Sequence, residues 1–135
     1  MGYLAGLKIE SVSKEKCTTS VPYKWLNKNP FQSMYFAVQS MAAELSTATT
    51  CLVATSGERP SIAFIIVSCK ANFIKKATSK VYFTCENAHE AFEAVEFCKI
   101  NDGAVAKTFK TIGRQTDNTI VSEFEFTWSF KTRKS

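Results

Sequence analysis

Histidine, proline and glycine are scarce in this sequence of 135 residues, which contains one His, three Pro and five Gly. Because so few residues favour loops, we expect most of the chain to lie in strands and helices. The single histidine, His89, has no cysteine near it, and none of the five cysteines forms a CxxC pair. The sequence therefore predicts no zinc or iron–sulfur site, and the cysteines are expected to be the reduced thiols of a cytoplasmic protein.

Long apolar runs are also missing. No stretch reaches the roughly 18 apolar residues that a membrane helix requires, and residues 1–16 become polar too soon for a secretory signal. Motifs for nucleotide binding, serine hydrolysis and zinc proteolysis do not occur. We therefore expect no membrane partner and no bound cofactor.

What is present describes a folded chain with a mild positive charge. Apolar residues make up 45% and charged residues 21%, so disorder is excluded, and we expect residues 1–135 to form a single domain. The net charge of +5 comes from scattered lysines and a short basic cluster at the C-terminal end. A solvated basic surface explains this charge, and binding of a polyanionic small molecule is the alternative. No motif accompanies it that would indicate a nucleic-acid partner.

The hydrophobic pattern predicts one long helix in the first half of the chain. Residues 4–12 and 15–24 are predicted to be extended, and a loop follows that contains Pro30. Asn29 is a plausible N-cap for the helix, and Gly57 a plausible stop. The apolar residues predicted to face the core recur at helical spacing: Met34, Ala37, Val38, Met41, Leu45, Ala48 and Leu52.

The second half predicts strands around one short helix. Strands are expected at 62–76 and 79–86, a helix at 88–100, and a hairpin from 103–115 and 119–132. Alternation places one set of residues on a single apolar face of the first of these strands: Ala63, Ile65, Val67, Cys69, Ala71 and Phe73. The last strand presents an aromatic face that suits a helix: Phe124, Phe126, Trp128 and Phe130. The fold class predicted is α+β, with a mostly antiparallel sheet wrapped around one long helix.

Glu44 is the only charged residue between Asn29 and Gly57. A charge in so apolar a helix needs a partner or a purpose. One interpretation is that this flank meets solvent or that Glu44 pairs with a lysine of a strand. The other is a carboxylate in a poorly solvated cleft, acting as a general base or a nucleophile.

The residues around this helix resemble the hotdog-fold acyl-CoA thioesterases. Glu44 follows, at the spacing of that family's helix signature, the stretch Asn29-Pro30-Phe31-Gln32-Ser33-Met34-Tyr35-Phe36-Ala37. A weaker similarity to the family's strand motif lies in Asn72-Phe73-Ile74-Lys75-Lys76-Ala77, and residues 121–131 are similar to its final strand. The resemblance extends from about Lys24 to Arg133 and is closest to a bacterial thioesterase-like subfamily related to the phenylacetate-degradation type.

The resemblance implies a hotdog fold and a thioesterase site. Glu44 would activate water or attack an acyl-CoA or acyl-carrier thioester, and Asn29 would hold the substrate. The backbone amides of Phe36 and Ala37 would bind the oxyanion, beside Gln32 and Tyr35. Lys75 and Lys76 would meet the coenzyme A phosphates, or remain solvated lysines at the end of a strand. Coenzyme A would enter only as part of the substrate.

Two departures from the family pattern keep an alternative open. Gln32 stands where the family commonly has glycine, and Tyr35-Phe36-Ala37 replaces a His-Gly-Gly sequence. These bulkier side chains would narrow the approach of a thioester, so a non-catalytic protein that binds acyl-CoA or another hydrophobic ligand is the second hypothesis. A dehydratase is disfavoured, because His89 lies on an amphipathic surface helix. The resemblance also implies a homodimer or homotetramer with the site between subunits.

Overall fold

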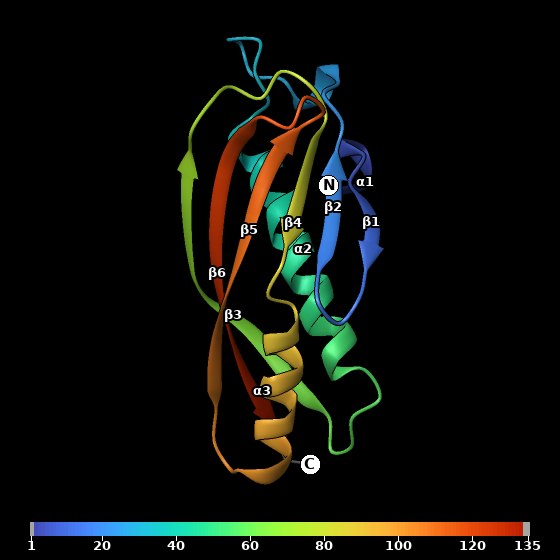
Figure 1. Cartoon of the computed structure of the whole chain (residues 1–135), viewed down its shortest axis with the longest axis vertical. Coiled ribbons are helices and arrows are strands. Elements are labelled where there is room, and N and C mark those ends of the chain that lie inside the picture. Colours follow the sequence, from blue (N-terminus) through green and yellow to red (C-terminus); the bar gives the residue numbers. More distant parts are fainter. Residues whose placement is uncertain (1, 134–135) are drawn as a thin grey trace.

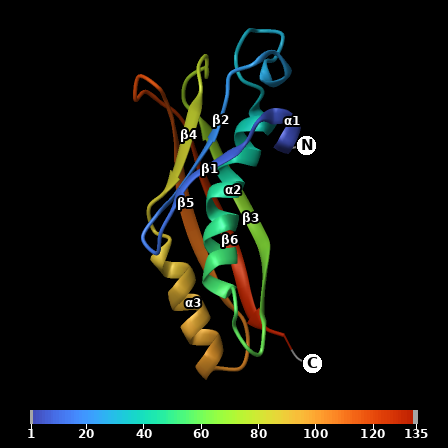
Figure 2. The same ribbon diagram turned by 90° about the vertical axis from the view of Figure 1, so that its right-hand side faces the viewer.

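A six-stranded antiparallel sheet wraps around one long helix. The computed structural model describes residues 2–133, with side chains from residue 4 onward. The strand order is β1-β2-β4-β5-β6-β3, the helix α2 crosses one face of the sheet, and α3 lies beyond the end of β4 (Figures 1 and 2). The elements are α1 (Gly2–Ala5), β1 (Lys8–Val12), β2 (Cys17–Val21), the 3-10 turn η1 (Trp25–Asn27), α2 (Phe36–Thr55), β3 (Ile62–Phe73), β4 (Val81–Cys85), α3 (His89–Ile100), β5 (Val105–Gln115) and β6 (Ile120–Thr132).

The predicted α+β arrangement is confirmed, including the hairpin of β5 and β6. The aromatic face of β6 packs under α2 as predicted, with Phe124 and Phe130 almost completely buried. Residues 2–5 form a short helix, so the first strand starts later than predicted. No helix in residues 2–133 is long and apolar enough to cross a membrane.

The start of α2 differs from the prediction. The helix begins at Phe36 rather than near Asn29, because the Asn29 side chain closes a separate turn. Gln32 within that turn has a φ of 61°, a left-handed conformation in which no α-helix continues. The predicted stop is confirmed, since α2 ends at Thr55 and Gly57 follows it with a φ of 78°.

The side of α2 that faces the sheet is also different from the one predicted. The buried side carries small and hydroxylated residues: Gln39, Ala42, Ala43, Ser46, Thr47, Thr49, Thr50, Cys51 and Ala54. The hydroxyls of Ser46, Thr47 and Thr50 have partners; Thr47 Oγ1, for example, accepts a hydrogen bond of 3.0 Å from Trp128 Nε1. Small residues let the helix approach the aromatic face of β6 closely. The predicted apolar stripe therefore flanks the buried side: Val38 and Ala48 are half-buried against the core, and Leu52 is 62% exposed.

A β-bulge changes the predicted faces of β3. Ile66 pairs with Trp128 and Ser68 with Thr127, which leaves Val67 as an extra residue. The bulge switches the alternation, so that Ile66 and Cys69 lie on the same face. The residues of β3 on the α2 side of the sheet are therefore Ile62, Phe64, Ile66, Cys69, Ala71 and Phe73. The single apolar face predicted from strict alternation is wrong beyond Ile66.

Candidate functional site

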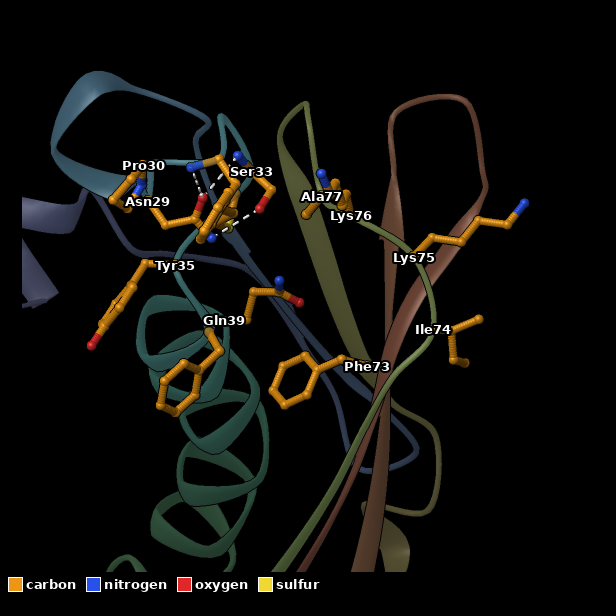
Figure 3. A pocket seen from close by; sticks show the side chains of 13 residues that line it. Asn29, Pro30, Ser33, Tyr35, Gln39, Phe73, Ile74, Lys75, Lys76 and Ala77 are labelled. Carbon is orange, nitrogen blue, oxygen red and sulfur yellow. Dashed lines mark hydrogen bonds between the residues drawn. The ribbon is translucent and has the colours of Figure 1, made fainter.

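A cavity of about 500 Å³ lies beside the N-terminal end of α2. Its walls come from the loop of residues 29–35, the first turn of α2 and residues 73–77 at the end of β3 (Figure 3). Apolar side chains form most of the lining: Pro30, Phe31, Met34, Phe36, Phe73, Ile74 and Ala77. An apolar cavity next to a helix start can hold an uncharged chain whose polar group meets the helix.

Backbone contacts to both neighbouring segments fix the loop before α2. The Tyr35 amide donates to the carbonyl of Asn27 at 2.7 Å, and the Met34 amide donates to the carbonyl of Ala77 at 2.8 Å. The Asn27 side chain is buried and donates to the carbonyls of Ala5 and Pro22, each at 2.8 Å. The chain just before residue 29, where the cavity lining begins, is therefore held in place by buried hydrogen bonds. Asn27 was missed in the sequence, where it looks like an ordinary loop residue.

Asn29 lines the cavity, as predicted, but its side chain is occupied within the loop. Its Oδ1 accepts hydrogen bonds from the amides of Phe31 at 2.9 Å and Ser33 at 3.2 Å. Its Nδ2 donates to Ser33 Oγ at 2.9 Å (Figure 3). Asn29 therefore shapes the loop in front of the helix.

The first amides of α2 are the free donors of the site. Tyr35, the N-cap, provides no side-chain acceptor, and its carbonyl accepts from Val38 and Gln39. Within the described residues, the N–H groups of Phe36 and Ala37 have no acceptor. A helix start also carries a partial positive charge from the helix dipole. Two such donors can stabilise an oxyanion, and the later start of α2 is what makes these two free.

Aromatic rings border this helix start. The ring of Phe36 is exposed by 57% and meets Phe73 edge to face, with centroids 6.1 Å apart. The Tyr35 ring points away from the β3 side of the cavity (Figure 3). The cavity remains open beside Phe36, so the bulk that replaces the family's glycine narrows one wall without filling the space.

Gln39 is a polar residue of the cavity wall that the sequence analysis missed. It lies one turn into α2 and is only 4% exposed. Its Oε1 accepts a hydrogen bond of 2.8 Å from the hydroxyl of Ser122, which is itself fully buried in β6. A glutamine inside an apolar helical pattern is the signal that could have identified it.

Lys75 and Lys76 both line the mouth of the cavity and are exposed. The Lys75 side chain extends away from α2 (Figure 3). Hydrogen bonds from the backbone and hydroxyl of Thr119 hold the pKa of Asp117 below its ordinary value, and the charge of Lys75 adds to this effect. Because the Lys75 side chain extends away from α2, Lys76 is the better placed of the two for an anion at the cavity mouth.

Glu44 lies outside this cavity in the same chain. It is exposed on the outward side of α2, near Cys69 of β3. Partial desolvation raises the pKa of the Cys69 thiol, and the negative charge of Glu44 raises it further. Of the ion pairs formed by residues 4–133, none includes Glu44, so the predicted pairing with a lysine of a strand is not observed.

Two other predicted site residues do not line the cavity. Gln32 is exposed, and its carbonyl accepts a hydrogen bond from the hydroxyl of Tyr23. Its positive φ explains why glycine suits this position. The side chain of Ala37 is half-buried outside the lining, so only its backbone amide remains a candidate for the site.

Solved structures with the same architecture are thioesterase-like proteins. A probable thioesterase from Pseudomonas aeruginosa has a TM-score of 0.82 at 14% identity, covering 97% of this chain and 86% of that chain. A thioesterase from Haemophilus influenzae has a TM-score of 0.73 at 16% identity, covering 97% of this chain and 82% of that one. A mutant thioesterase from Staphylococcus aureus has a TM-score of 0.73 at 14% identity, covering 96% and 97%.

These similarities confirm the hotdog fold predicted from the helix signature. At the level of sequence, no family model and no curated protein matches the chain. The phenylacetate-degradation subfamily is not confirmed, and identities this low establish the fold alone.

Proposed function

We propose that this protein hydrolyses acyl thioesters, either acyl-CoA or acyl-carrier thioesters. The observation that carries the proposal is the pair of unpartnered amides at Phe36 and Ala37, beside an apolar cavity of about 500 Å³. Amides in this arrangement stabilise the negative charge that develops on a thioester oxygen under attack. The thioesterases among the structural neighbours support the same class of reaction.

Glu44 is the proposed catalytic carboxylate, and we propose that it acts in the cavity of a second copy of the chain. It lies about 12 Å along the helix axis from Phe36, too far to reach the amides of its own chain. It is also on the outward side of α2, where apolar residues such as Leu52 remain exposed. A carboxylate in such a surface becomes poorly solvated only when another subunit covers it.

The proposed assembly is a homodimer formed along β3 and the outward side of α2. β3 is a twelve-residue edge strand, and long apolar edges are normally covered. Ile66 and Phe73 are 42% and 48% exposed on its α2 side. A twofold axis across β3 sets the two α2 helices side by side, so that the partner subunit's Glu44 approaches the cavity. Pairing of two dimers would give a homotetramer with the same sites.

One further similarity supports the assignment of Asn29 and Glu44 to the same type of site. Two structures of one Staphylococcus aureus protein are of mutants: in one structure a glutamate is replaced by alanine, and in the other a glutamine is replaced by alanine. Those two positions are separated by as many residues as Asn29 and Glu44 are in this chain.

In the proposed reaction, Glu44 accepts a proton from a water molecule whose oxygen forms a bond to the thioester carbon. The carbonyl oxygen becomes an oxyanion held by the amides of Phe36 and Ala37. When the C=O bond re-forms, the C–S bond breaks, and the thiolate takes the proton from the Glu44 carboxyl group and leaves as coenzyme A or the carrier thiol. In a variant of this reaction, Glu44 attacks the carbon directly, and the C–S bond breaks to give an anhydride and a thiolate that takes a proton from water. A second water then hydrolyses the anhydride, which releases the acid and restores the Glu44 carboxylate.

The remaining residues have supporting roles in this proposal. Asn29 holds the loop, Tyr35 caps the helix, and Gln32 forms the tight turn between them. Lys76, with a smaller part for Lys75, meets the phosphates of coenzyme A. The reaction needs no cofactor other than the coenzyme A of the substrate. We also propose a cytoplasmic location, since the five cysteines are free thiols.

Hydrolysis of a panel of acyl-CoAs by the wild type and by Glu44→Ala tests the proposal. We expect measurable turnover in the wild type and a loss of at least about 100-fold in the variant. Because no ion pair formed by residues 4–133 includes Glu44, the variant should not unfold at a lower temperature than the wild type. Absence of turnover in the wild type, or equal turnover in both, would contradict the proposal.

The position of Phe36 favours one alternative, a non-catalytic protein that binds acyl-CoA or another hydrophobic ligand. Its ring occupies the place where the family keeps a glycine. This alternative predicts that acyl-CoA raises the melting temperature of the protein and remains uncleaved during the measurement.

A further inference from the structure

The Gln39 side chain presents an unused hydrogen-bond donor to the cavity. It projects from α2 toward the gap between Ser33 and Phe73 (Figure 3). Its Oε1 is occupied by the Ser122 hydroxyl, so the amide group is oriented with Nε2 toward the cavity. Within residues 4–133 no hydrogen bond uses Nε2 as a donor, and only Glu58 Oε1 is both fully buried and without a partner, so Nε2 is accessible from the cavity. A ligand that brings an oxygen to Nε2 replaces its hydrogen bond to water with a direct one.

The surroundings of Nε2 define the kind of acceptor that fits. Met34, Phe73 and Ile74 make this part of the wall apolar, so a charged acceptor would lose its hydration without gaining a counter-ion. A neutral oxygen, either a hydroxyl or a carbonyl, satisfies the amide without that loss. A saturated hydrocarbon chain in the same place would leave the donor unpaired.

The position of Gln39 relative to the free amides indicates where on the substrate this oxygen lies. The thioester oxygen is already served by Phe36 and Ala37 in the proposed function, on which this inference rests. Gln39 lies three residues beyond Phe36 in α2, and both residues line the cavity. Carbon 3 is two carbon atoms away from the thioester carbonyl, so one acyl group can meet the amides of the helix start and the Gln39 side chain together.

We propose that Gln39 Nε2 donates a hydrogen bond to an oxygen on carbon 3 of the acyl group, so that the site prefers 3-hydroxyacyl or 3-oxoacyl thioesters to saturated ones. Ser122 is the positioning residue for this contact, because its hydroxyl fixes the amide orientation. Sites built to hydrogen-bond a substrate oxygen discriminate strongly against analogues that lack it.

The kinetic test compares 3-hydroxybutanoyl-CoA with butanoyl-CoA. In the wild type, kcat/KM should be at least about tenfold higher for the hydroxylated substrate. Gln39→Met keeps the length of the side chain and removes the donor, so the ratio should fall to about one through loss on the hydroxylated substrate alone. Asn72→Leu removes a side-chain amide at an exposed position of β3 outside the cavity and should keep the wild-type ratio and melting temperature.

Ser122→Ala tests whether Ser122 orients the Gln39 amide or only contributes to the stability of the fold. It should reduce the preference for the hydroxylated substrate while leaving kcat/KM for butanoyl-CoA unchanged. Equal losses on both substrates in Gln39→Met, or an unchanged ratio, would overturn the proposal and leave the thioesterase function standing.

Calorimetric binding makes the inference testable apart from turnover. In Glu44→Gln protein, 3-hydroxybutanoyl-CoA should bind about tenfold more tightly than butanoyl-CoA, and Gln39→Met in the same background should abolish the difference. If the wild type hydrolyses neither substrate but this difference persists, the proposed function fails and the specificity of Gln39 stands. Equal affinities in Glu44→Gln would refute the role of Gln39.

Discussion

At the scale of single residues, the central feature is a backbone group. The free N–H of Phe36 belongs to the first position of α2, where proline is well accommodated. Tyr35 before it has φ −61° and ψ 133°, a conformation that a residue before proline readily adopts. The amide donor can therefore be removed without disturbing the helix.

Phe36→Pro, compared with Phe36→Ala, tests that donor. Both variants lose the aromatic ring and its contact with Phe73, and only the proline variant loses the N–H group. We expect kcat for acyl-CoA hydrolysis to be about 100-fold lower in Phe36→Pro than in Phe36→Ala, at similar melting temperatures. Equal kcat values in two stable proteins would show that this amide does not hold the oxyanion.

Gly113 is a second residue with a clear expectation. It pairs with Phe83 in the sheet, and an added Cβ would lie 2.6 Å from Phe83 Cε1 and 2.9 Å from Ser122 Oγ. Phe83 is fully buried and cannot move aside easily. We expect Gly113→Ala to reduce the free energy of unfolding by about 1–3 kcal/mol, measured by urea denaturation. An unchanged midpoint and slope of the urea denaturation curve would contradict this expectation, because it would mean that the Phe83 ring can move away from an added methyl group.

Sequence reasoning named part of the proposed site at this scale. Glu44 stood out because its helix carries no other charge, and the helix signature located Phe36 and Ala37. The role of Asn29 in a separate turn was missed, because the choice between capping a helix and closing a turn depends on tertiary contacts such as that of Met34 with Ala77. Gln39 was missed because a glutamine in an apolar helical pattern is a weak signal, and its buried partner, Ser122, lies 83 residues away in the sequence.

At the scale of elements, α2 is rotated about its axis relative to the prediction, so that the predicted apolar stripe flanks the buried side instead of forming it. The apolar stripe was correctly recognised, but periodicity reveals only that a face is apolar, not which partner covers it. The aromatic face of β6 already fills the space between sheet and helix, so small residues such as Ala42 and Ala43 fit there. Larger side chains such as Leu52 face outward. In β3, a bulge at Val67 has no signature in the sequence, so the alternation beyond it was wrong.

The uncovered side of β3 gives a prediction about assembly. Ile66 lies on the α2 side of the sheet, within the proposed interface, and Ile65 lies on the opposite side. A lysine at position 66 would bury a charge between two apolar surfaces. We expect Ile66→Lys to be monomeric by light scattering at micromolar concentration, while the wild type is at least a dimer.

Ile65→Lys is the matched control, since Ile65 is 64% exposed on the other face of the same strand. This variant should remain a dimer. If the wild type is a tetramer, Ile65→Lys would at most prevent two dimers from associating. A monomeric wild type, or an Ile66→Lys variant that remains dimeric, would exclude the proposed interface.

At the scale of the whole molecule, the proposed function makes the site of one chain incomplete without a second copy. The cavity and free amides lie at one end of α2, and the carboxylate lies on an outward surface about 12 Å away. Cys69, next to Glu44 and exposed in the single chain, reports whether that surface is covered. The other four cysteines are buried, and burial raises the pKa of Cys85 to about 12.

Thiol labelling under native conditions uses this reporter. The wild-type assembly should yield no rapidly reacting thiol, whereas monomeric Ile66→Lys should yield one per chain, at Cys69. Because the pKa of Cys69 is raised, its labelling rate should keep increasing above the pH at which a free cysteine is mostly ionised. Replacing Glu44 with glutamine in the Ile66→Lys background removes a nearby negative charge, so labelling at pH 8 should become faster. Rapid labelling of Cys69 in the intact wild type would mean that this surface is open.

Complementation between two inactive chains tests the central claim, a site shared between subunits. Glu44→Ala lacks the carboxylate and Phe36→Pro lacks the amide donor, so each homodimer should be inactive. In a mixed dimer, the cavity of the Glu44→Ala chain receives Glu44 from the Phe36→Pro chain. Refolding the two variants together in equal amounts should therefore restore about a quarter of the wild-type activity. If each chain uses its own Glu44, every site in the mixture lacks one group, and no activity will return.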